Sequence, residues 1–384
     1  MPVFDSRISQ ALEKRRQEEL TRTLLPFKNG NTTELVSRNS QYVNFSSNDY
    51  LGLAAEPALA KAWQEGLELY GCGSGASPLV TGFSHAHLQL EEALCDWLCY
   101  ERAILFSSGF SANQALLFTL LKKGDLLVQD KLNHASLMEA GSLCPATMKR
   151  FKHNDVEQLR GLLAEDTNCL VMTEGVFSMD GDQSPLQSVQ QACQGKAWLA
   201  VDDAHGVGVL GENGKGSTFH QAVKPEILVV TFGKAFGLSG AAILCSASVG
   251  DYLTQFSRHH VYSTAIPPAQ AYALRHSLQM IQTNQWRRDK LAELQSIYHD
   301  KLHGLQGYIN THTPIKPLII GNTENALASA EFLRQQGFWA TAIRQPTVPK
   351  DQARIRLTLT ANHTNKQVSD LCDSILRAME KVQL

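Results

Sequence analysis

Six short apolar segments, separated by tens of residues, constrain the fold of this 384-residue chain more than any other feature. They cover residues 103–106, 126–128, 170–172, 198–201, 227–230 and 241–244. Between them apolar residues recur at helical spacing, and parallel strands need long crossover connections of this kind. From about residue 53 to about residue 281, the pattern therefore predicts an α/β domain with a mostly parallel sheet.

The chain before this domain follows a different pattern. A polar amphipathic helix is expected over residues 8–20, and a short strand at 42–45 follows a turn-rich stretch. We predict that residues 1–52 form an N-terminal arm and that the large domain covers 53–282.

The pattern changes again after the large domain. A long amphipathic helix leads out of it, and a second helix over 324–336 ends at Gly337, a residue suited to a helix C-terminus. Residues 354–359 alternate polar and apolar side chains, which predicts a half-buried antiparallel strand. We therefore predict a small C-terminal α+β domain at 283–384.

Charge and composition narrow the function. The 35 Lys and Arg residues nearly balance 37 Asp and Glu residues, a net charge of −2, which argues against nucleic acid or an anionic membrane as partner and favours a small substrate. No apolar run approaches the ~20 residues of a membrane span, and residues 1–20 lack the apolar core of a signal peptide, so we expect a soluble, non-exported protein.

The eight cysteines form neither a C-x-x-C pair nor a zinc-site spacing, which predicts reduced thiols and a cytoplasmic location. Cys95 and Cys99 lie four positions apart, so we expect them on one helix face, where packing is their ordinary role. His85 and His87 lack a third metal ligand, and we interpret them as surface residues at the start of a helix. No metal site is predicted.

The residues that follow the predicted strands carry the chemistry. Lys234 follows the strand at 227–230 and is flanked by Gly233 and Gly237, and Asp202 and His205 follow the strand at 198–201. A lysine amine, a buried acid and a histidine at neighbouring strand ends are what a pyridoxal phosphate enzyme needs, because they supply a Schiff-base former and a counter-charge for the pyridine nitrogen.

Three other predicted strand ends add polar groups. Residues 107–114 open a helix, with Ser111 and Gln114 fitting a capping box, and this helix start either binds a phosphate or is an ordinary helix start. His134 follows the strand at 126–128; it is either structural or stacks on a pyridine ring. The acids of residues 174–182 suggest a shaped loop more than a cation site.

Other mechanisms lack their motifs. The glycines at 71, 73, 75 and 82 match neither a dinucleotide-binding fingerprint nor a P-loop, so they form either a substrate-side loop or a turn. No strand carries G-x-S-x-G, which argues against a serine hydrolase. Because ligands of open α/β sheets bind at the carboxyl ends of the strands, the strand-end residues above are expected to face one crevice.

With these residues in place, the chain resembles the α-oxoamine synthase family of fold-type I pyridoxal phosphate enzymes. The likeness runs nearly end to end, through residues 44–53, 133–136, 173–182, 202–206, 231–237 and 261–264. It implies pyridoxal phosphate as cofactor, Lys234 as its imine-forming residue, Asp202 at the pyridine nitrogen and His134 stacked on the ring. Further cofactor contacts implied by the resemblance are Ser178 and His205 at the ring hydroxyl, Gly109, Phe110 and Thr231 at the phosphate, and Thr264 at the phosphate of the neighbouring subunit of a homodimer.

The resemblance also implies the reaction. It is the decarboxylative condensation of L-alanine with pimeloyl-CoA or pimeloyl-acyl carrier protein, a step of biotin biosynthesis, in which the Lys234 amine removes the α-proton. Arg344 is expected to bind the amino acid carboxylate, with Thr347 in the same pocket, and Arg22 to meet the acyl group. Asn48 and His134 are expected to bind substrate as well. The alternatives are a sibling synthase that uses glycine, a non-catalytic pyridoxal-binding subunit, and a nicotinamide-dependent dehydrogenase, which the missing fingerprint disfavours.

Overall fold

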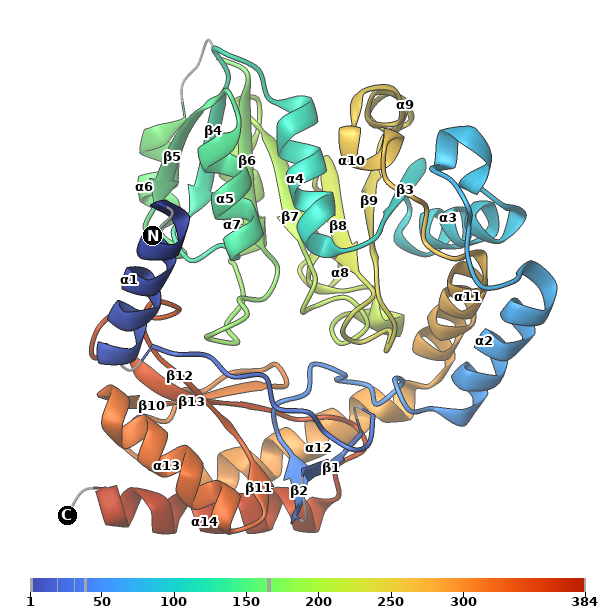
Figure 1. Cartoon of the computed structure of the whole chain (residues 1–384). Coiled ribbons are helices and arrows are strands. Elements are labelled where there is room, and N and C mark those ends of the chain that lie inside the picture. The colour runs from blue at the N-terminus through green and yellow to red at the C-terminus, as the bar shows by residue number, and fades with distance from the viewer. Residues whose placement is uncertain (1–2, 19, 31, 38–39, 164–166, 383–384) are drawn as a thin grey trace.

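A seven-stranded sheet organises the larger part of the computed structural model, which describes residues 3–18, 20–30, 32–37, 40–163 and 167–382 (Figure 1). In spatial order its strands are β3 (Arg102–Phe106), β9 (Ala241–Cys245), β8 (Ile227–Thr231), β7 (Trp198–Asp202), β6 (Cys169–Glu174), β4 (Leu126–Asp130) and β5 (Thr147–Phe151). Only β9 runs antiparallel to its neighbours in this sheet. The mostly parallel sheet and its six predicted strands are therefore confirmed.

Helices cover both faces of this sheet, because crossover connections place them there. One buried cluster joins the sheet to helices α4 (Gly109–Leu120), α5 (Ala135–Leu143) and α9 (Ala247–Phe256), beside the short α10 (Arg258–Val261). A larger cluster on the other face includes residues of α2 (Pro57–Tyr70), α3 (His85–Leu98), α6 (Val156–Leu162), α7 (Leu186–Cys193) and α11 (Pro268–Thr283). Short elements complete this part: the π-helical turn η1 (Pro78–Gly82), the 3-10 turn η2 (Glu212–Gly214) and α8 (Ser217–His220).

Strand β5 was not predicted. Its sequence, Thr-Met-Lys-Arg-Phe, contains no apolar run, and of its five residues only Phe151 is buried. It lies at the edge of the sheet and pairs with β4 alone. An edge strand needs no continuous apolar run, so the pattern that identified the central strands could not find it.

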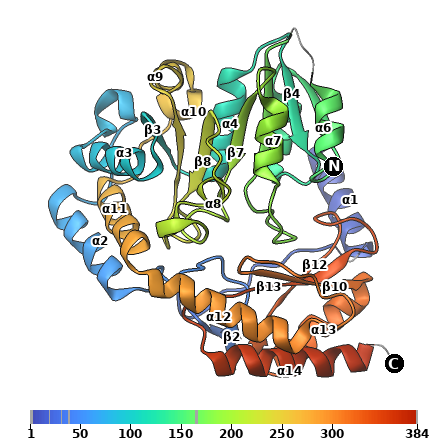
Figure 2. The same ribbon diagram turned by 180° about the vertical axis from the view of Figure 1, so that it is seen from behind.

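The C-terminal part has its own antiparallel sheet. Helix α12 (Gln285–Leu302) leads to β10 (Ile315–Gly321), β13 (Ala353–Thr358) and β12 (Thr341–Ile343), in the order β10-β13-β12, with α13 (Thr323–Gln335) and α14 (Asn365–Val382). Figure 2 shows α12, α13 and α14 below the large sheet. The predicted α+β character is confirmed. The predicted half-burial of the strand at 354–359 is wrong: every residue of β13 is buried, because the strand is central and its arginines bind groups of the large sheet's loops.

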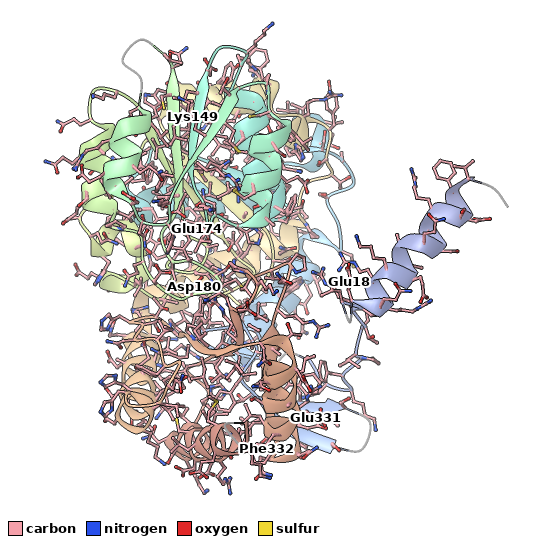
Figure 3. All side chains as sticks on the ribbon, turned by 90° about the vertical axis from the view of Figure 1, so that its left-hand side faces the viewer. Glu18, Lys149, Glu174, Asp180, Glu331 and Phe332 are labelled. Carbon is pink, nitrogen blue, oxygen red and sulfur yellow. The ribbon has the colours of Figure 1, made fainter. Side chains whose placement is uncertain are left out.

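The N-terminal arm joins this C-terminal part. Strands β1 (Glu34–Ser37) and β2 (Ser40–Asn44) form a small sheet with β11 (Phe338–Trp339), in the order β1-β2-β11. Helix α1 (Val3–Gln17) buries none of its residues, and Figure 3 shows it standing apart from the rest of the chain. The exact region boundaries at 52 and 282 stay predictions.

Two local expectations are wrong. Helix α3 ends at Leu98, and Cys99 follows in a left-handed conformation, so Cys95 and Cys99 do not share a helix face. His87 is buried, and its Nε2 lies 2.7 Å from the carbonyl oxygen of Ile266. His85 is exposed as expected. All eight cysteines are free thiols. Within the described ranges, no helix has the length and apolar content needed to cross a bilayer.

Candidate active site

A cavity of about 280 Å³ lies at the carboxyl ends of the large sheet's parallel strands. Its walls come from the ends of β3, β4, β6, β7 and β8, together with α4 and the segment after β2. Eight of the predicted site residues line it: Asn48, Gly109, Phe110, His134, Asp202, His205, Thr231 and Lys234. The predicted convergence of strand ends on one crevice is therefore present in the fold.

Lys234 lies in a tight turn after β8. Its carbonyl accepts a hydrogen bond from the amide of Gly237 at 2.8 Å. Gly237 has a φ of +70°, and a Cβ there would lie 2.5 Å from the amide nitrogen of Ala54, so only glycine fits. Burial lowers the pKa of the Lys234 amine, although Asp202 and Glu174 oppose the shift. A larger fraction of the amine is thus neutral, as a nucleophile or base requires.

Asp202 ends β7, and donors hold both of its carboxylate oxygens. Oδ2 accepts a hydrogen bond from the Asn113 side chain at 2.7 Å, and Oδ1 accepts one from the amide of Ala204 at 3.0 Å. The carboxyl group is 5% exposed and so is shielded from water. Sequence reasoning missed Asn113; a polar residue in the interior of an apolar helix was the available signal.

His134 caps the N-terminus of α5. Its Nδ1 accepts a hydrogen bond from the amide of Ser136 at 3.2 Å and lies 2.8 Å from the Ser136 hydroxyl. Burial lowers the pKa of His134, and the nearby Lys234 lowers it further, against the opposing effect of Asp202. Because Nδ1 accepts a hydrogen bond from an amide, it carries no hydrogen, so the ring is neutral with its hydrogen on Nε2.

The N-terminus of α4 forms the other end of the cavity. Ser108 caps this helix by accepting a hydrogen bond from the amide of Ser111 at 3.1 Å, so the capping box predicted for Ser111 and Gln114 is wrong: the helix begins earlier, at Gly109. A Cβ on Gly109 would lie 2.6 Å from Thr231 Cγ2, so glycine permits this close approach. The buried hydroxyl of Thr231 has no protein partner. Helix amides and a free hydroxyl suit a phosphate group.

The cavity therefore fits pyridoxal phosphate on structural grounds. It places an amine of lowered pKa, a shielded carboxylate, a neutral imidazole and a helix N-terminus around one space. The described parts of the chain hold no group of three His, Cys, Asp or Glu residues placed to bind a metal ion, so no metal site there competes with this interpretation.

Three further residues belong to the site: sequence reasoning missed Tyr50 and Arg356, whereas it placed Glu174 among the strand-end residues that face the crevice. The Tyr50 hydroxyl lies 2.6 Å from His205 Nδ1. Arg356 of β13 donates a hydrogen bond through Nη2 to Asn48 Oδ1 at 3.2 Å. Burial of His205, together with the nearby charges of Lys234 and Arg356, holds the pKa of His205 well below its ordinary value. Glu174 lies beside Asp202 in the sheet register; burial and Asp202 raise its pKa well above the ordinary value.

The remaining predicted residues lie elsewhere. Ser178 does not line the cavity, but its carbonyl accepts a hydrogen bond from Arg356 Nε at 2.6 Å. Thr264 is exposed, between α10 and α11. Arg22, Arg344 and Thr347 line a second cavity of about 530 Å³ between the arm and the C-terminal part.

This fold and this site define a fold-type I, pyridoxal phosphate-dependent transferase. The aminotransferase class I and II family model matches residues 40–375. The 8-amino-7-oxononanoate synthase of Vibrio atlanticus (strain LGP32) is 62% identical over 382 residues, which cover 99% of this chain and 95% of that protein. The chain therefore belongs to the class I and II aminotransferase family.

Solved structures agree with this assignment. A serine palmitoyltransferase from S. paucimobilis with a bound PLP–myriocin aldimine has a TM-score of 0.91 and 26% identity, covering 99% of this chain and 98% of that one. The 8-amino-7-oxononanoate synthase of Francisella tularensis has a TM-score of 0.79 and 29% identity, covering 89% and 99%. The predicted family, fold type, enzyme class and cofactor are confirmed.

Proposed function

We propose that the chain condenses L-alanine with a pimeloyl thioester to give 8-amino-7-oxononanoate, CO2 and the free thiol carrier, as a step of biotin biosynthesis. The names of its relatives at about 60% identity support this reaction. The observation that carries the proposal is the convergence of Lys234, Asp202 and His134 on one cavity. A new bond joins the alanine α-carbon to the acyl carbon, and the alanine carboxylate leaves as CO2.

The residues around the cavity would hold the cofactor. Lys234 would bind it covalently, and Gly109, Phe110 and Thr231 would hold its phosphate at the N-terminus of α4. His134 presents a neutral ring for stacking. Ser178 and His205 are proposed at the ring hydroxyl.

Asp202 supplies the charge that the chemistry needs. When bound, pyridoxal phosphate withdraws the electrons left at the α-carbon after its proton is removed. Asp202 would stabilise a positive charge on the pyridine nitrogen; a charge pair at ~4 Å and an effective dielectric constant of ~20 contributes on the order of 4 kcal/mol. Asn113 and the amide of Ala204 fix the direction of the carboxylate.

Lys234 moves the proton. The free Lys234 amine would take the α-proton of alanine onto Nζ and, after CO2 is lost, would return a proton to the same carbon. The lowered pKa of Lys234 keeps a usable fraction of the amine unprotonated. Burial of the cavity walls would exclude water, so that the α-carbon is not protonated before it reacts with the acyl group.

We assign the alanine carboxylate to Arg356. This guanidinium is 8% exposed, bonds Asn48 and Ser178, and lies near enough to Lys234 to lower its pKa. Arg344 and Thr347, which the resemblance places at the carboxylate, line the second cavity with Arg22. There they would meet the acyl thioester, whose thiol carrier is coenzyme A or a carrier protein. We further propose a cytoplasmic homodimer in which Thr264 faces the partner's site.

A product assay tests the reaction. Purified protein with pyridoxal phosphate is given alanine or glycine together with pimeloyl-CoA, pimeloyl-acyl carrier protein or acetyl-CoA, and products are identified by mass. We expect 8-amino-7-oxononanoate from alanine and a pimeloyl thioester only. Lys234→Ala should lose the borohydride-reducible cofactor adduct and at least ~10³-fold of the rate. Product from glycine and acetyl-CoA alone would identify a sibling synthase, and no product with any pair would refute the proposal.

A further inference from the structure

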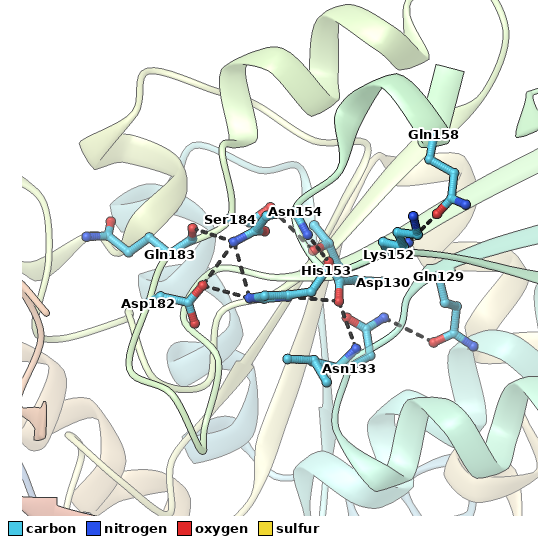
Figure 4. Close-up of polar contacts among 12 residues, drawn as sticks. Gln129, Asp130, Asn133, Lys152, His153, Asn154, Gln158, Asp182, Gln183 and Ser184 are labelled. Carbon is cyan, nitrogen blue, oxygen red and sulfur yellow. Dashed lines mark hydrogen bonds and ion pairs between the residues drawn. The ribbon is translucent and has the colours of Figure 1, made fainter. Parts of the chain in front are cut away.

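A polar cluster outside the cavity joins three loops at the carboxyl edge of the sheet (Figure 4). Its centre is His153, which follows β5. His153 Nδ1 lies 3.1 Å from Asp130 Oδ1, and Nε2 lies 2.7 Å from Asp182 Oδ2. The ring also stands edge-on to Phe177, with centroids 4.4 Å apart.

Both ring nitrogens of His153 therefore face carboxylate oxygens. Carboxylates accept, so each nitrogen must donate, and only the imidazolium form can do so at both positions. Burial lowers the pKa of His153, but the hydrogen bonds and charges of Asp130 and Asp182 outweigh it and raise the pKa to about 10. Asp130 is fully buried and so depends on these donors for its compensation.

Asp130 connects His153 to the loop that carries His134. Its Oδ1 accepts a hydrogen bond from the amide of Leu132 at 2.8 Å, and its carbonyl accepts one from the amide of Asn133 at 3.2 Å. The Asn133 side chain in turn donates to the carbonyl of Met172 at 2.8 Å. His134 follows directly, so its position depends on this anchored turn.

Asp182 connects His153 to the loop that carries Ser178. Its carbonyl accepts a hydrogen bond from the amide of Phe177 at 3.0 Å, which closes the loop on itself. Asn154 reinforces the link by donating to Asp182 Oδ2 at 2.9 Å and to the carbonyl of Gln183 at 3.3 Å. Asn154 adopts a left-handed φ of 56°, which asparagine tolerates better than most residues.

We propose that His153 is a positioning residue: it fixes the His134 loop and the Ser178 loop to each other and thereby holds His134 in place in the wall of the cofactor cavity. His153 does not line the cavity, so it acts through these two loops. The proposal rests on the cofactor roles proposed above for His134 and Ser178. The opposite side of the Ser178 loop is held by the C-terminal part, through Thr313, Arg354 and Arg356, so His153 supplies the anchor on the large-sheet side.

Hydrogen exchange of the cofactor-free protein tests this without any activity measurement. In His153→Ala we expect the amides of residues 131–134 and 176–183 to exchange about tenfold faster or more, because charge-assisted hydrogen bonds are lost. Strand β7 and helix α14 should keep their protection. His303→Ala, an exposed histidine in the C-terminal part, is the matched control and should change neither segment.

His153→Gln and the double variant His153→Ala/Asp182→Ala sharpen the test. Gln keeps one amide donor, so its exchange should lie between wild type and Ala; the double variant should exchange no faster in residues 176–183 than either single variant. Exchange within about twofold of wild type in both segments would overturn the proposal. So would an equal rise throughout the sheet in both His153→Ala and His153→Gln, which would indicate general destabilisation.

Kinetics of the cofactor-loaded enzyme give an independent readout. His153→Ala should lower kcat about tenfold and weaken cofactor binding, while KM for the pimeloyl thioester stays within about twofold, since no residue of the cluster lines the second cavity. A change in that KM with unchanged kcat would contradict the proposal. Failure of the wild-type product assay would instead count against the proposed function and leave the exchange result to decide the positioning role.

Discussion

At the scale of single residues, some residues of the site can be recognised from the sequence, whereas others are placed there only by the fold. Lys234, Asp202 and His134 each follow an apolar strand, and a polar residue there is a local signal. Asn113 lies inside an apolar helix, where its polar side chain is the only local signal, and Arg356 lies inside a strand, where nothing local marks it. Asn113 lines the cavity and Arg356 binds Asn48 in the cavity wall because distant elements pack together, and that packing could not be predicted from periodicity.

The same substitution at Arg356 and at Arg344 tests which of the two residues binds the alanine carboxylate. Arg356→Lys removes a planar fork that bonds Ser178 and Asn48, so KM for alanine should rise about tenfold or more. Arg344→Lys, the matched change in the second cavity, should act mainly on KM for the acyl thioester. Steady-state kinetics with each substrate varied in turn checks this. A larger rise in alanine KM from Arg344→Lys would return the carboxylate to Arg344.

Burial of Lys316 predicts that the stability of the folded protein depends on pH. This β10 amine is 2% exposed and donates to the Thr311 carbonyl at 2.7 Å, and burial lowers its pKa from 10.5 to about 7. The unfolded chain therefore binds the proton more tightly, and the free energy of unfolding contributed by Lys316 rises as pH increases from about 7 to about 10. Each pKa unit corresponds to about 1.4 kcal/mol, so the rise is a few kcal/mol at most.

Urea unfolding at pH 6 to 10 checks the Lys316 prediction. Lys316→Met should lose this rise relative to wild type, whereas Lys61→Met, at an exposed surface position, should keep it. Parallel curves for wild type and Lys316→Met would show that the buried amine does not titrate in this range.

At the scale of elements, the central strands were predictable because both of their faces are buried and their sequences are continuously apolar. Strands β5 and β13 do not follow that rule. The first is polar because it lies at an edge, and the second is fully buried although it carries Arg354 and Arg356, because those guanidinium groups find partners in the Ser178 loop. Such partners lie far away in sequence, so alternation alone suggested a solvent-exposed face.

The contact between α4 and β8 gives a prediction at this scale. In Gly109→Ala, the new methyl group meets Thr231 Cγ2 and must push the helix N-terminus away from the strand. We expect the dissociation constant for pyridoxal phosphate to rise about tenfold, because its phosphate would bind at this helix N-terminus, with a small loss of thermal stability. Spectroscopic titration of the cofactor-free protein with pyridoxal phosphate measures it. Gly161→Ala in α6, where a Cβ meets no other atom within 4 Å, is the control and should bind normally.

At the scale of the whole molecule, the fold leaves an apolar surface near the proposed partner site. Leu79, Val80 and Phe83 are exposed at and beside η1, which packs against α10, and Tyr262 is 76% exposed two residues before Thr264. Large exposed apolar side chains gathered in one place are typical of an interface. This surface supports the proposed homodimer and is the face that we expect it to use.

Sedimentation at micromolar concentration should give about twice the chain mass of 42.3 kDa. The double change Val80→Glu/Tyr262→Glu should shift the protein toward monomer, because it buries charge in the interface. Ile309→Glu, on a distant exposed apolar residue, should leave the mass unchanged. A wild-type monomer, or a mass unaffected by the double change, would contradict this assignment of the surface.

The pairing of β2 with β11 has a consequence for biosynthesis of the protein. The first strands made by the ribosome have no complete sheet to join until Phe338 and Trp339 have been translated. Asn48, a few residues beyond β2, therefore reaches its place in the cavity wall only near the end of translation. A nascent chain that stops earlier contains every strand of the large sheet and Lys234, yet it lacks β11, the strand of the C-terminal part that pairs with the arm.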